Sequence, residues 1–133
     1  MRQLAADIIL IENDKILLIK RGKEPFLGFF AVPGGRLEED ETVEQCAIRE
    51  MEEETGLKVK LTQFIGIYSE PSRDPRKIVA VAYLAKRIGG ELLAGDDAAE
   101  AKWFSLNELP KLAGDHKKIV MDALKIIKSK YEK

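Results

Sequence analysis

The stretch GGRLEEDETVEQCAIREMEEETGL, residues 34–57, decides the fold that this chain is expected to adopt. Within it, residues 42–55 predict an α-helix. Thr42 stands at the N-cap position with Gln45 three residues later, which is the spacing of a capping box. Gly56 stands where a helix commonly ends on a left-handed glycine. Apolar side chains recur at helical spacing, so one side of the helix is expected to pack against a sheet; they are Val43, Ala47, Ile48 and Met51.

The same helix carries a concentrated negative charge. Glu50, Glu53 and Glu54 stand at i, i+3 and i+4, which brings their side chains to one surface, with Glu52 beside them. Like charges at this spacing destabilise an isolated helix by roughly 0.2–0.5 kcal/mol per pair. Arg49 alone cannot neutralise the group, whereas a hard divalent cation with oxygen ligands would. The alternative is a solvated acidic face that binds nothing.

The wider spacing favours a metal site over a solvated face. Five residues separate Gly35 from Glu41, seven more precede Arg49 and Glu50, and residues 53–57 read EETGL. Over these 23 residues the chain resembles the Nudix box at every defined position. The resemblance implies a Nudix hydrolase with an α/β (α+β) fold, in which a mixed β-sheet lies between helices (α/β/α). The predicted order of strands and helices fits this family along the whole chain.

The resemblance also implies roles for the acidic residues and the glycines. Glu50 and Glu54 correspond to ligands of Mg²⁺ or Mn²⁺, and Glu53 to a further ligand or a general base. The turn at Gly34 and Gly35 lets the backbone approach metal or phosphates closely and offers a carbonyl ligand. Family members activate a water molecule that attacks a phosphorus, while metal stabilises the developing charge.

The remaining box residues are expected to support this chemistry. The resemblance implies that Arg49 orients Glu53 and pairs with Glu41. Together with Glu53 and Glu54, Arg49 therefore belongs to the predicted catalytic group. Glu41 and Gly56 are expected to be structural.

The flanking sequence predicts one domain over residues 1–133. Residues 5–11 and 16–19 are rich in Ile and Leu around the polar Glu12-Asn13-Asp14, as in a β-hairpin. Pro33-Gly34-Gly35 predicts a turn. Asp115 is expected to cap a final helix. Further strands are predicted at residues 29–32, 57–68, 77–85 and 101–104.

Composition excludes several classes of protein. The 133 residues are 45% hydrophobic and 34% charged, which is typical of a globular protein. A net charge of −1 gives no reason to expect a nucleic-acid partner. Apolar runs are too short to span a bilayer, so no membrane partner is expected. Cys46 is the only cysteine, so no internal disulfide can form, and a cytoplasmic location is expected.

Segments outside the box resemble small ADP-ribose pyrophosphatases, and together they extend the resemblance over nearly the whole chain. They are residues 25–35, 68–76 (YSEPSRDPR), 94–104 (AGDDAAEAKWF) and 112–116 (LAGDH). The chain departs from the common pattern at Lys77-Ile78, where many such enzymes have Gly-His, and at Gly114, where phenylalanine is more usual. The expected substrate is ADP-ribose, cut to AMP and ribose 5-phosphate.

Candidate substrate contacts follow from side-chain chemistry. Arg73 and Arg76 suit a diphosphate, because guanidinium groups match phosphate oxygens; the alternative is ordinary loop charge. Phe26 and Phe30 suit stacking on adenine, against the alternative of core packing. No basic cluster for a third phosphate is evident.

Three further residues have competing interpretations. Asp97 is expected to complete the metal site or accept the proton of water, as a loop acid does in related enzymes. His116 is the only histidine, and its surroundings at a helix start explain it without catalysis. Cys46 is expected to pack rather than react.

Two other functions remain open for this sequence. One is hydrolysis of nucleoside triphosphates or dinucleoside polyphosphates on the same fold. The other is a Nudix-fold module that binds a nucleotide without cutting it, although such modules usually lack box glutamates and this chain has all four. Because small enzymes of this family are often dimers, a homodimer is one expected assembly.

Overall fold

A computed structural model of the chain describes residues 1–95 and 98–131. It contains seven β-strands, two α-helices and one short 3-10 helix. The elements in chain order are β1 (Leu4–Glu12), β2 (Lys15–Arg21), β3 (Phe30–Ala31), β4 (Gly34–Arg36), α1 (Val43–Thr55), β5 (Leu57–Tyr68), η1 (Pro71–Arg73), β6 (Val79–Gly90), β7 (Ala98–Ser105) and α2 (His116–Tyr131).

Strand β1 is the centre of the sheet and has three partners. Along one edge its last residues pair antiparallel with β2 and its first residues, Ala5 to Asp7, pair antiparallel with β4. Along the other edge it pairs parallel with β6, from Leu4↔Val79 to Leu10↔Ala85. β5 then pairs with β6, and β7 with β2, both antiparallel. The sheet is therefore mixed, as the sequence predicts.

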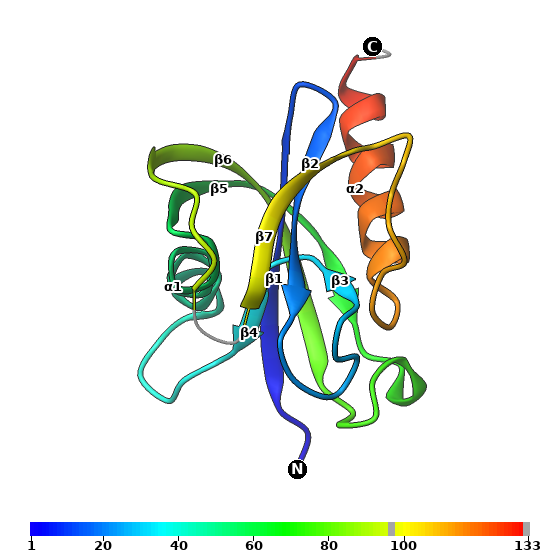
Figure 1. Cartoon of the computed structure of the whole chain (residues 1–133). Coiled ribbons are helices and arrows are strands. Elements are labelled where there is room, and N and C mark those ends of the chain that lie inside the picture. Colours follow the sequence, from blue (N-terminus) through cyan, green and yellow to red (C-terminus); the bar gives the residue numbers. More distant parts are fainter. Residues whose placement is uncertain (96–97, 132–133) are drawn as a thin grey trace.

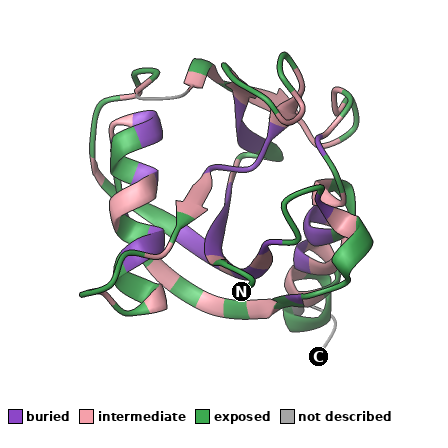
Figure 2. Ribbon diagram, turned by 90° about the horizontal axis from the view of Figure 1, so that it is seen from below, coloured by how far each residue is buried: buried purple, intermediate pink, exposed green. Residues whose placement is uncertain are grey.

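The two helices cover opposite faces of this sheet (Figure 1). Successive side chains of a strand point to opposite faces, so β1 serves both layers. Ile8 and Leu10 belong to the cluster that includes Met51 of α1, whereas Ile9 belongs to the cluster that includes Ile119 of α2. Figure 2 shows buried residues along the central strands and on both helices. This arrangement confirms the predicted mixed sheet between helices.

Local signals place α1 where the sequence predicts it. Thr42 accepts a hydrogen bond from the Gln45 backbone N–H, and the Gln45 side chain accepts one from the Thr42 backbone N–H, which completes the capping box. Gly56 ends the helix at φ 79°, and its N–H donates to the Glu52 carbonyl. α1 is thereby held at both ends without help from its acidic side chains.

The hairpin prediction is also confirmed, because β1 and β2 meet in register at Glu12↔Lys15. Asn13 and Asp14 between them both have positive φ, 51° and 61°, as a two-residue hairpin turn requires. The prediction of a turn at Pro33-Gly34-Gly35 is wrong for the glycines. Gly34 and Gly35 begin strand β4, because β1 offers them an open edge at Ala6 and Asp7.

We expect Gly56→Ala to lower the free energy of unfolding by more than about 1–2 kcal/mol, the cost of a left-handed non-glycine residue. A methyl group at this position would also overlap the Glu91 carbonyl oxygen. Urea denaturation measures the effect. Gly89→Ala is the matched control, because no positive φ is involved and the nearest atoms, in Lys58, lie 3.9 Å away. Equal stability of the two variants would contradict this account.

Candidate active site

A cleft of about 460 Å³ opens between the first half of β1, strand β4, the last turns of α1 and the segment around η1. Three glutamates of the box, Glu50, Glu53 and Glu54, line it together with the two glycines of β4. The expected convergence of the box residues on one site is therefore what the fold produces. Strands of the sheet line one side of the cleft, and η1 and the start of α2 line the other side.

The glycines allow β4 to lie directly against α1. A methyl group at Gly35 would overlap the Glu50 carboxyl, and one at Gly34 would overlap the Asp7 carboxyl and the Ala6 carbonyl oxygen. The Gly34 N–H donates to Oε1 of Glu54 over 2.7 Å. Glycine is required here for space, so that the backbone can reach the carboxylates.

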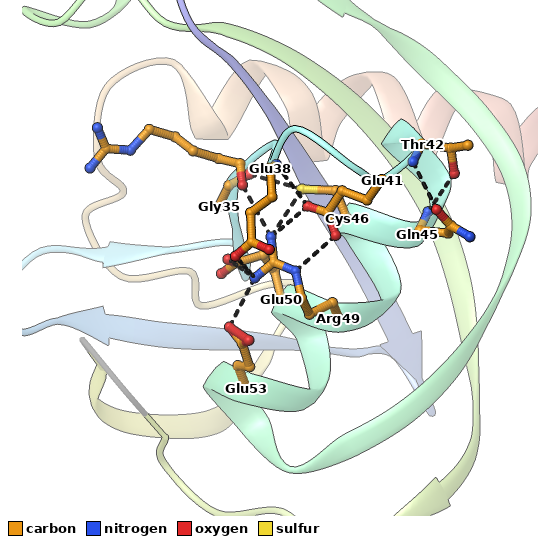
Figure 3. A network of polar contacts seen from close by, with 10 residues as sticks. Gly35, Glu38, Glu41, Thr42, Gln45, Cys46, Arg49, Glu50 and Glu53 are labelled. Atoms are coloured by element: carbon orange, nitrogen blue, oxygen red, sulfur yellow. Dashed lines mark hydrogen bonds and ion pairs between the residues drawn. The ribbon is translucent and has the colours of Figure 1, made fainter.

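Arg49 lies at the centre of the network in Figure 3. Its Nε and Nη2 donate to the two carboxylate oxygens of Glu41 over 2.9 and 2.6 Å. Nη1 donates to Glu50 over 2.7 Å and to Glu53 over 3.0 Å, and Nη2 also reaches the Arg36 carbonyl. The two contacts that the family resemblance implies for Arg49, with Glu41 and Glu53, are both present.

The same network sets the charge of Glu41. Hydrogen bonds from Arg49 lower the pKa of the Glu41 carboxyl to about 2. Only 12% of the Glu41 side chain is exposed. Glu41 therefore stabilises the position of Arg49 on α1 and is not a solvated surface charge. Its second role is to accept a hydrogen bond from the Glu38 N–H, which shapes the loop before α1.

Glu54 is the most buried of the box glutamates, with 8% of its surface exposed. Burial raises the pKa of its carboxyl to about 8, and Glu50 and Asp7 add to the rise against the hydrogen bond from Gly34. Burial raises the pKa of Glu50 as well. Desolvation causes both shifts, and for Glu50 it outweighs the opposing effect of the Arg49 guanidinium.

This donor set fits a divalent cation. Glu50, Glu54 and the Gly35 carbonyl offer only oxygen atoms, as magnesium and manganese prefer. Within residues 1–95 and 98–131, no three His, Cys, Asp or Glu side chains stand together as a ready-made metal cluster. Arg49 holds carboxylate oxygens of Glu50 and Glu53 against its guanidinium.

The two arginines predicted to bind the diphosphate line the cleft but already have partners. Arg73 donates to both carboxylate oxygens of Asp115 over 2.9 Å and to the Ile78 carbonyl over 2.9 Å, and only 6% of its side chain is exposed. It ties η1 to the start of α2. Arg76 forms a two-point pair with Asp74 and keeps 34% of its side chain exposed, so it is the more accessible of the two.

Of the two phenylalanines predicted to stack on adenine, one lies in the core and the other beside the cleft. Phe30 packs edge-on against Phe104 at 4.8 Å between ring centroids, within the core cluster under α2. This packing favours the core alternative for Phe30. Phe26 packs against Phe29 and lines a small pocket beside the cleft. Asp97, with Asp96, lies outside the described residues.

Cys46 behaves as expected for a packing residue. It is fully buried, and its Sγ donates to the Gly35 carbonyl over 3.4 Å. Burial raises the pKa of its thiol to about 12. Asp115 precedes α2 as predicted, and its backbone carbonyl accepts from the Lys118 N–H. Its carboxylate is bonded to Arg73.

Two polar residues of the cleft were not predicted as functional. Asp7 is buried in the middle of an apolar strand, and His116, at the first residue of α2, is partly buried with 17% of its side chain exposed. The available signal was the acidic residue at a core position of residues 5–11, because an unpaired charge is rarely placed there. The structure also lines the cleft with five basic residues, which corrects the expectation that no basic cluster is present; they are Arg21, Lys23, Arg36, Arg73 and Arg76.

Comparison with known proteins gives the family and several named relatives. The NUDIX domain family matches residues 1–123. The chain is 52% identical over 123 residues to a Methanocaldococcus jannaschii protein named ADP-ribose pyrophosphatase, covering 92% of this chain and 73% of that protein. It is 36% identical over 104 residues to a Bacillus subtilis protein named putative 8-oxo-dGTP diphosphatase, covering 77% of this chain and 66% of the relative.

A solved structure shares the fold. The NUDIX domain of Shewanella oneidensis NrtR, crystallised with ADP ribose, superimposes with a TM-score of 0.84 at 27% identity, covering 96% of this chain and 89% of that one. The box geometry, the family match and the relatives agree with one another. The chain belongs to the NUDIX domain family and is a Nudix hydrolase.

Proposed function

We propose that the chain hydrolyses ADP-ribose to AMP and ribose 5-phosphate with a divalent metal ion as cofactor. The observation that carries the proposal is the buried Glu54 carboxylate, anchored by the Gly34 N–H beside Glu50 in a cleft of nucleotide size. The choice of nucleotide is supported by the 52% identical relative named ADP-ribose pyrophosphatase. A small nucleotide is accordingly the proposed partner.

Glu50, Glu54 and the Gly35 carbonyl are the proposed metal ligands. A bound Mg²⁺ or Mn²⁺ ion would polarise the diphosphate and lower the pKa of a bound water. Glu53 completes the set. Its side chain is 46% exposed and Arg49 donates to only one of its oxygens, Oε2, which leaves the other for a water proton or a second cation.

The chain's own part in the reaction is to orient these groups. A water oxygen forms a bond to one phosphorus, the bond from that phosphorus to the bridging oxygen breaks, and the water proton passes to a carboxylate such as Glu53. Arg49 keeps Glu50 and Glu53 in place by bonding both to one guanidinium nitrogen. Arg76 is the proposed diphosphate contact, and Phe26 the proposed contact with the base.

A second candidate activity is hydrolysis of a nucleoside triphosphate. It is favoured by the identity to the Bacillus subtilis relative and by the five basic residues of the cleft. Two of those residues, Arg73 and Arg76, are already neutralised by aspartates. A non-catalytic binding module is disfavoured because Glu41, Glu50, Glu53 and Glu54 are all present.

The cellular location and the oligomeric state are proposed from the sequence and the family resemblance. The described helices include none that is long and apolar enough to cross a membrane. We propose a cytoplasmic location, which the free Cys46 thiol supports. A homodimer is proposed from the family resemblance, and light scattering with size-exclusion chromatography tests it.

Glu54→Gln should abolish metal-dependent activity without unfolding the protein. The Gln oxygen can still accept from Gly34, and the side chain keeps its size. We expect a rate loss above the roughly 10–100-fold seen for outer metal partners, an unchanged melting temperature without metal, and loss of the stabilisation that Mg²⁺ gives to the wild type.

Hydrolysis assays and thermal melts with Mg²⁺ or with a chelator measure these effects. Glu52→Gln, an exposed neighbour on the same helix, is the matched control and should behave as wild type. Full activity of Glu54→Gln, or of the wild type in chelator, would contradict the proposed metal site.

Arg49→Ala should lower stability as well as rate, because four carboxylates lose their shared cation. At neutral pH we expect a loss of about 1–3 kcal/mol, as for hydrogen bonds to charged groups. Glu41 has a lowered pKa of about 2 against its usual 4.5. Its contribution is therefore complete above pH 4.5 and disappears as pH falls through about 2.

The part of the difference in melting temperature between wild type and Arg49→Ala that comes from Glu41 should thus shrink as the pH falls from 4.5 toward 2. Thermal melts across this range measure it. A large rate loss with an unchanged melting temperature would indicate instead that Arg49 contacts substrate directly.

For substrate choice, kcat/KM for ADP-ribose should exceed that for ATP, dGTP or 8-oxo-dGTP by about tenfold or more, equivalent to at least about 1.4 kcal/mol. The physical reason is that two cleft arginines are already paired, which leaves fewer cations for a third phosphate. A Mg²⁺-dependent screen of these substrates and of dinucleoside polyphosphates decides it. Better turnover of a triphosphate would establish the second candidate and leave the family assignment intact.

A further inference from the structure

Asp7 lies on the floor of the cleft in an unusual environment for a carboxylate. It is the only charged residue of β1 before Glu12. It points to the same face as Ile9, toward α2, because side chains alternate along the strand. Only 6% of its surface is exposed, yet it lines the cleft. A carboxylate in such a position normally has hydrogen-bonded partners.

None of the described residues donates a hydrogen bond to the Asp7 carboxylate. The nearest basic nitrogen is Nε2 of His116, 3.9 Å from Oδ2, which is too long for a hydrogen bond. The guanidiniums of Arg73 and Arg76, which also line the cleft, are bonded to Asp115 and Asp74. Asp7 therefore presents an unused acceptor to the cleft.

His116 presents an unused donor beside it. The Val32 N–H donates to Nδ1 of His116 over 3.1 Å, so Nδ1 is the acceptor nitrogen. In the neutral ring the proton is then on Nε2, the atom that faces Asp7. An acceptor and a donor 3.9 Å apart leave room for one small group within hydrogen-bond distance of both.

A hydroxyl group matches this pair, because it donates one hydrogen bond and accepts others. The exocyclic amine of adenine does not, since its protons can satisfy Asp7 but it offers no acceptor to His116. A phosphate oxygen would meet the carboxylate as a like charge. A hydroxyl is thus the small group that satisfies both side chains from a single atom.

We propose that Asp7 and His116 form a subsite that binds a ribose hydroxyl of the substrate. The proposal rests on the proposed function and names what distinguishes a sugar nucleotide from a simple phosphate ester at this site. The two residues are positioned by different layers of the fold, one by the central strand and the other by the first residue of α2. The hydroxyl joins them when substrate binds.

The test combines enzyme variants with substrate analogues. Asp7→Asn keeps shape but turns one oxygen into a donor, and His116→Gln is the second variant. Each is assayed on ADP-ribose and on analogues in which one hydroxyl of the terminal or of the adenosine ribose is replaced by hydrogen. Asp122→Asn, whose carboxylate is bonded to Tyr68 and Lys118, is the control for loss of one charge.

For the wild type, removal of one particular hydroxyl should lower kcat/KM by at least about tenfold, because a site built for a hydroxyl rejects its deoxy analogue. Asp7→Asn and His116→Gln should show that loss already with ADP-ribose, and no further loss with the same analogue. The sensitive hydroxyl identifies which ribose is bound. Affinity for Mn²⁺, measured without nucleotide, should be unchanged in both variants.

Three outcomes would overturn the subsite. If the wild type has the same kcat/KM for ADP-ribose and for every deoxy analogue, Asp7 and His116 bind only water. Equal losses on all analogues in the variants would indicate a structural role, and a lower Mn²⁺ affinity would make Asp7 a metal residue. If the wild type prefers another nucleotide diphosphate, the proposed function fails, and deoxy analogues of that substrate test the subsite separately.

Discussion

The close contact between strand β4 and helix α1 is the constraint on which the site depends. Three consecutive residues of β4 each meet a different box residue: Gly34 bonds to Glu54, Gly35 lies against the Glu50 carboxyl, and the Arg36 carbonyl accepts from Arg49. No side chain larger than hydrogen fits at the first two positions. Glu54 and Glu50 therefore lie against backbone atoms, which cannot change rotamer, whereas Glu53 is held by Arg49.

This contact also links the site to the core. β4 pairs with β1 at Ala5, Ala6 and Asp7, and the next residues of β1 are among the most buried of the molecule. A shift of α1 would have to move β4, and a shift of β4 would break its pairing with β1. The acidic surface of α1 is tolerated because these contacts, together with the two helix caps, hold it from both sides.

The sequence predicted those features whose signals are local. The capping box at Thr42, the glycine after α1 and the polar turn of the first hairpin each specify a conformation within a few residues, and each is confirmed. The extent of β5 was predicted to the residue. The convergence of the box glutamates followed from helical spacing together with a known motif.

What the sequence could not supply are partners distant in the chain. Gly34 and Gly35 look like a turn until β1 offers an edge. Arg73 looks free to bind phosphate until α2 brings Asp115 against it. Asp7 and His116 stand at opposite ends of the chain, and only the assembled sheet and α2 make them neighbours.

The parallel pairing of β1 with β6 has a consequence for folding during synthesis on the ribosome. Residues 4–10 cannot complete their hydrogen bonds until residues 79–85 have been synthesised. At about 5–20 residues per second, the 75 positions that separate each residue from its partner take roughly 4–15 s. During that interval one edge of the most apolar strand has no partner within the nascent chain. Such an edge invites pairing with other chains, so the ribosome-bound intermediate is the stage at which this small enzyme is most exposed to aggregation.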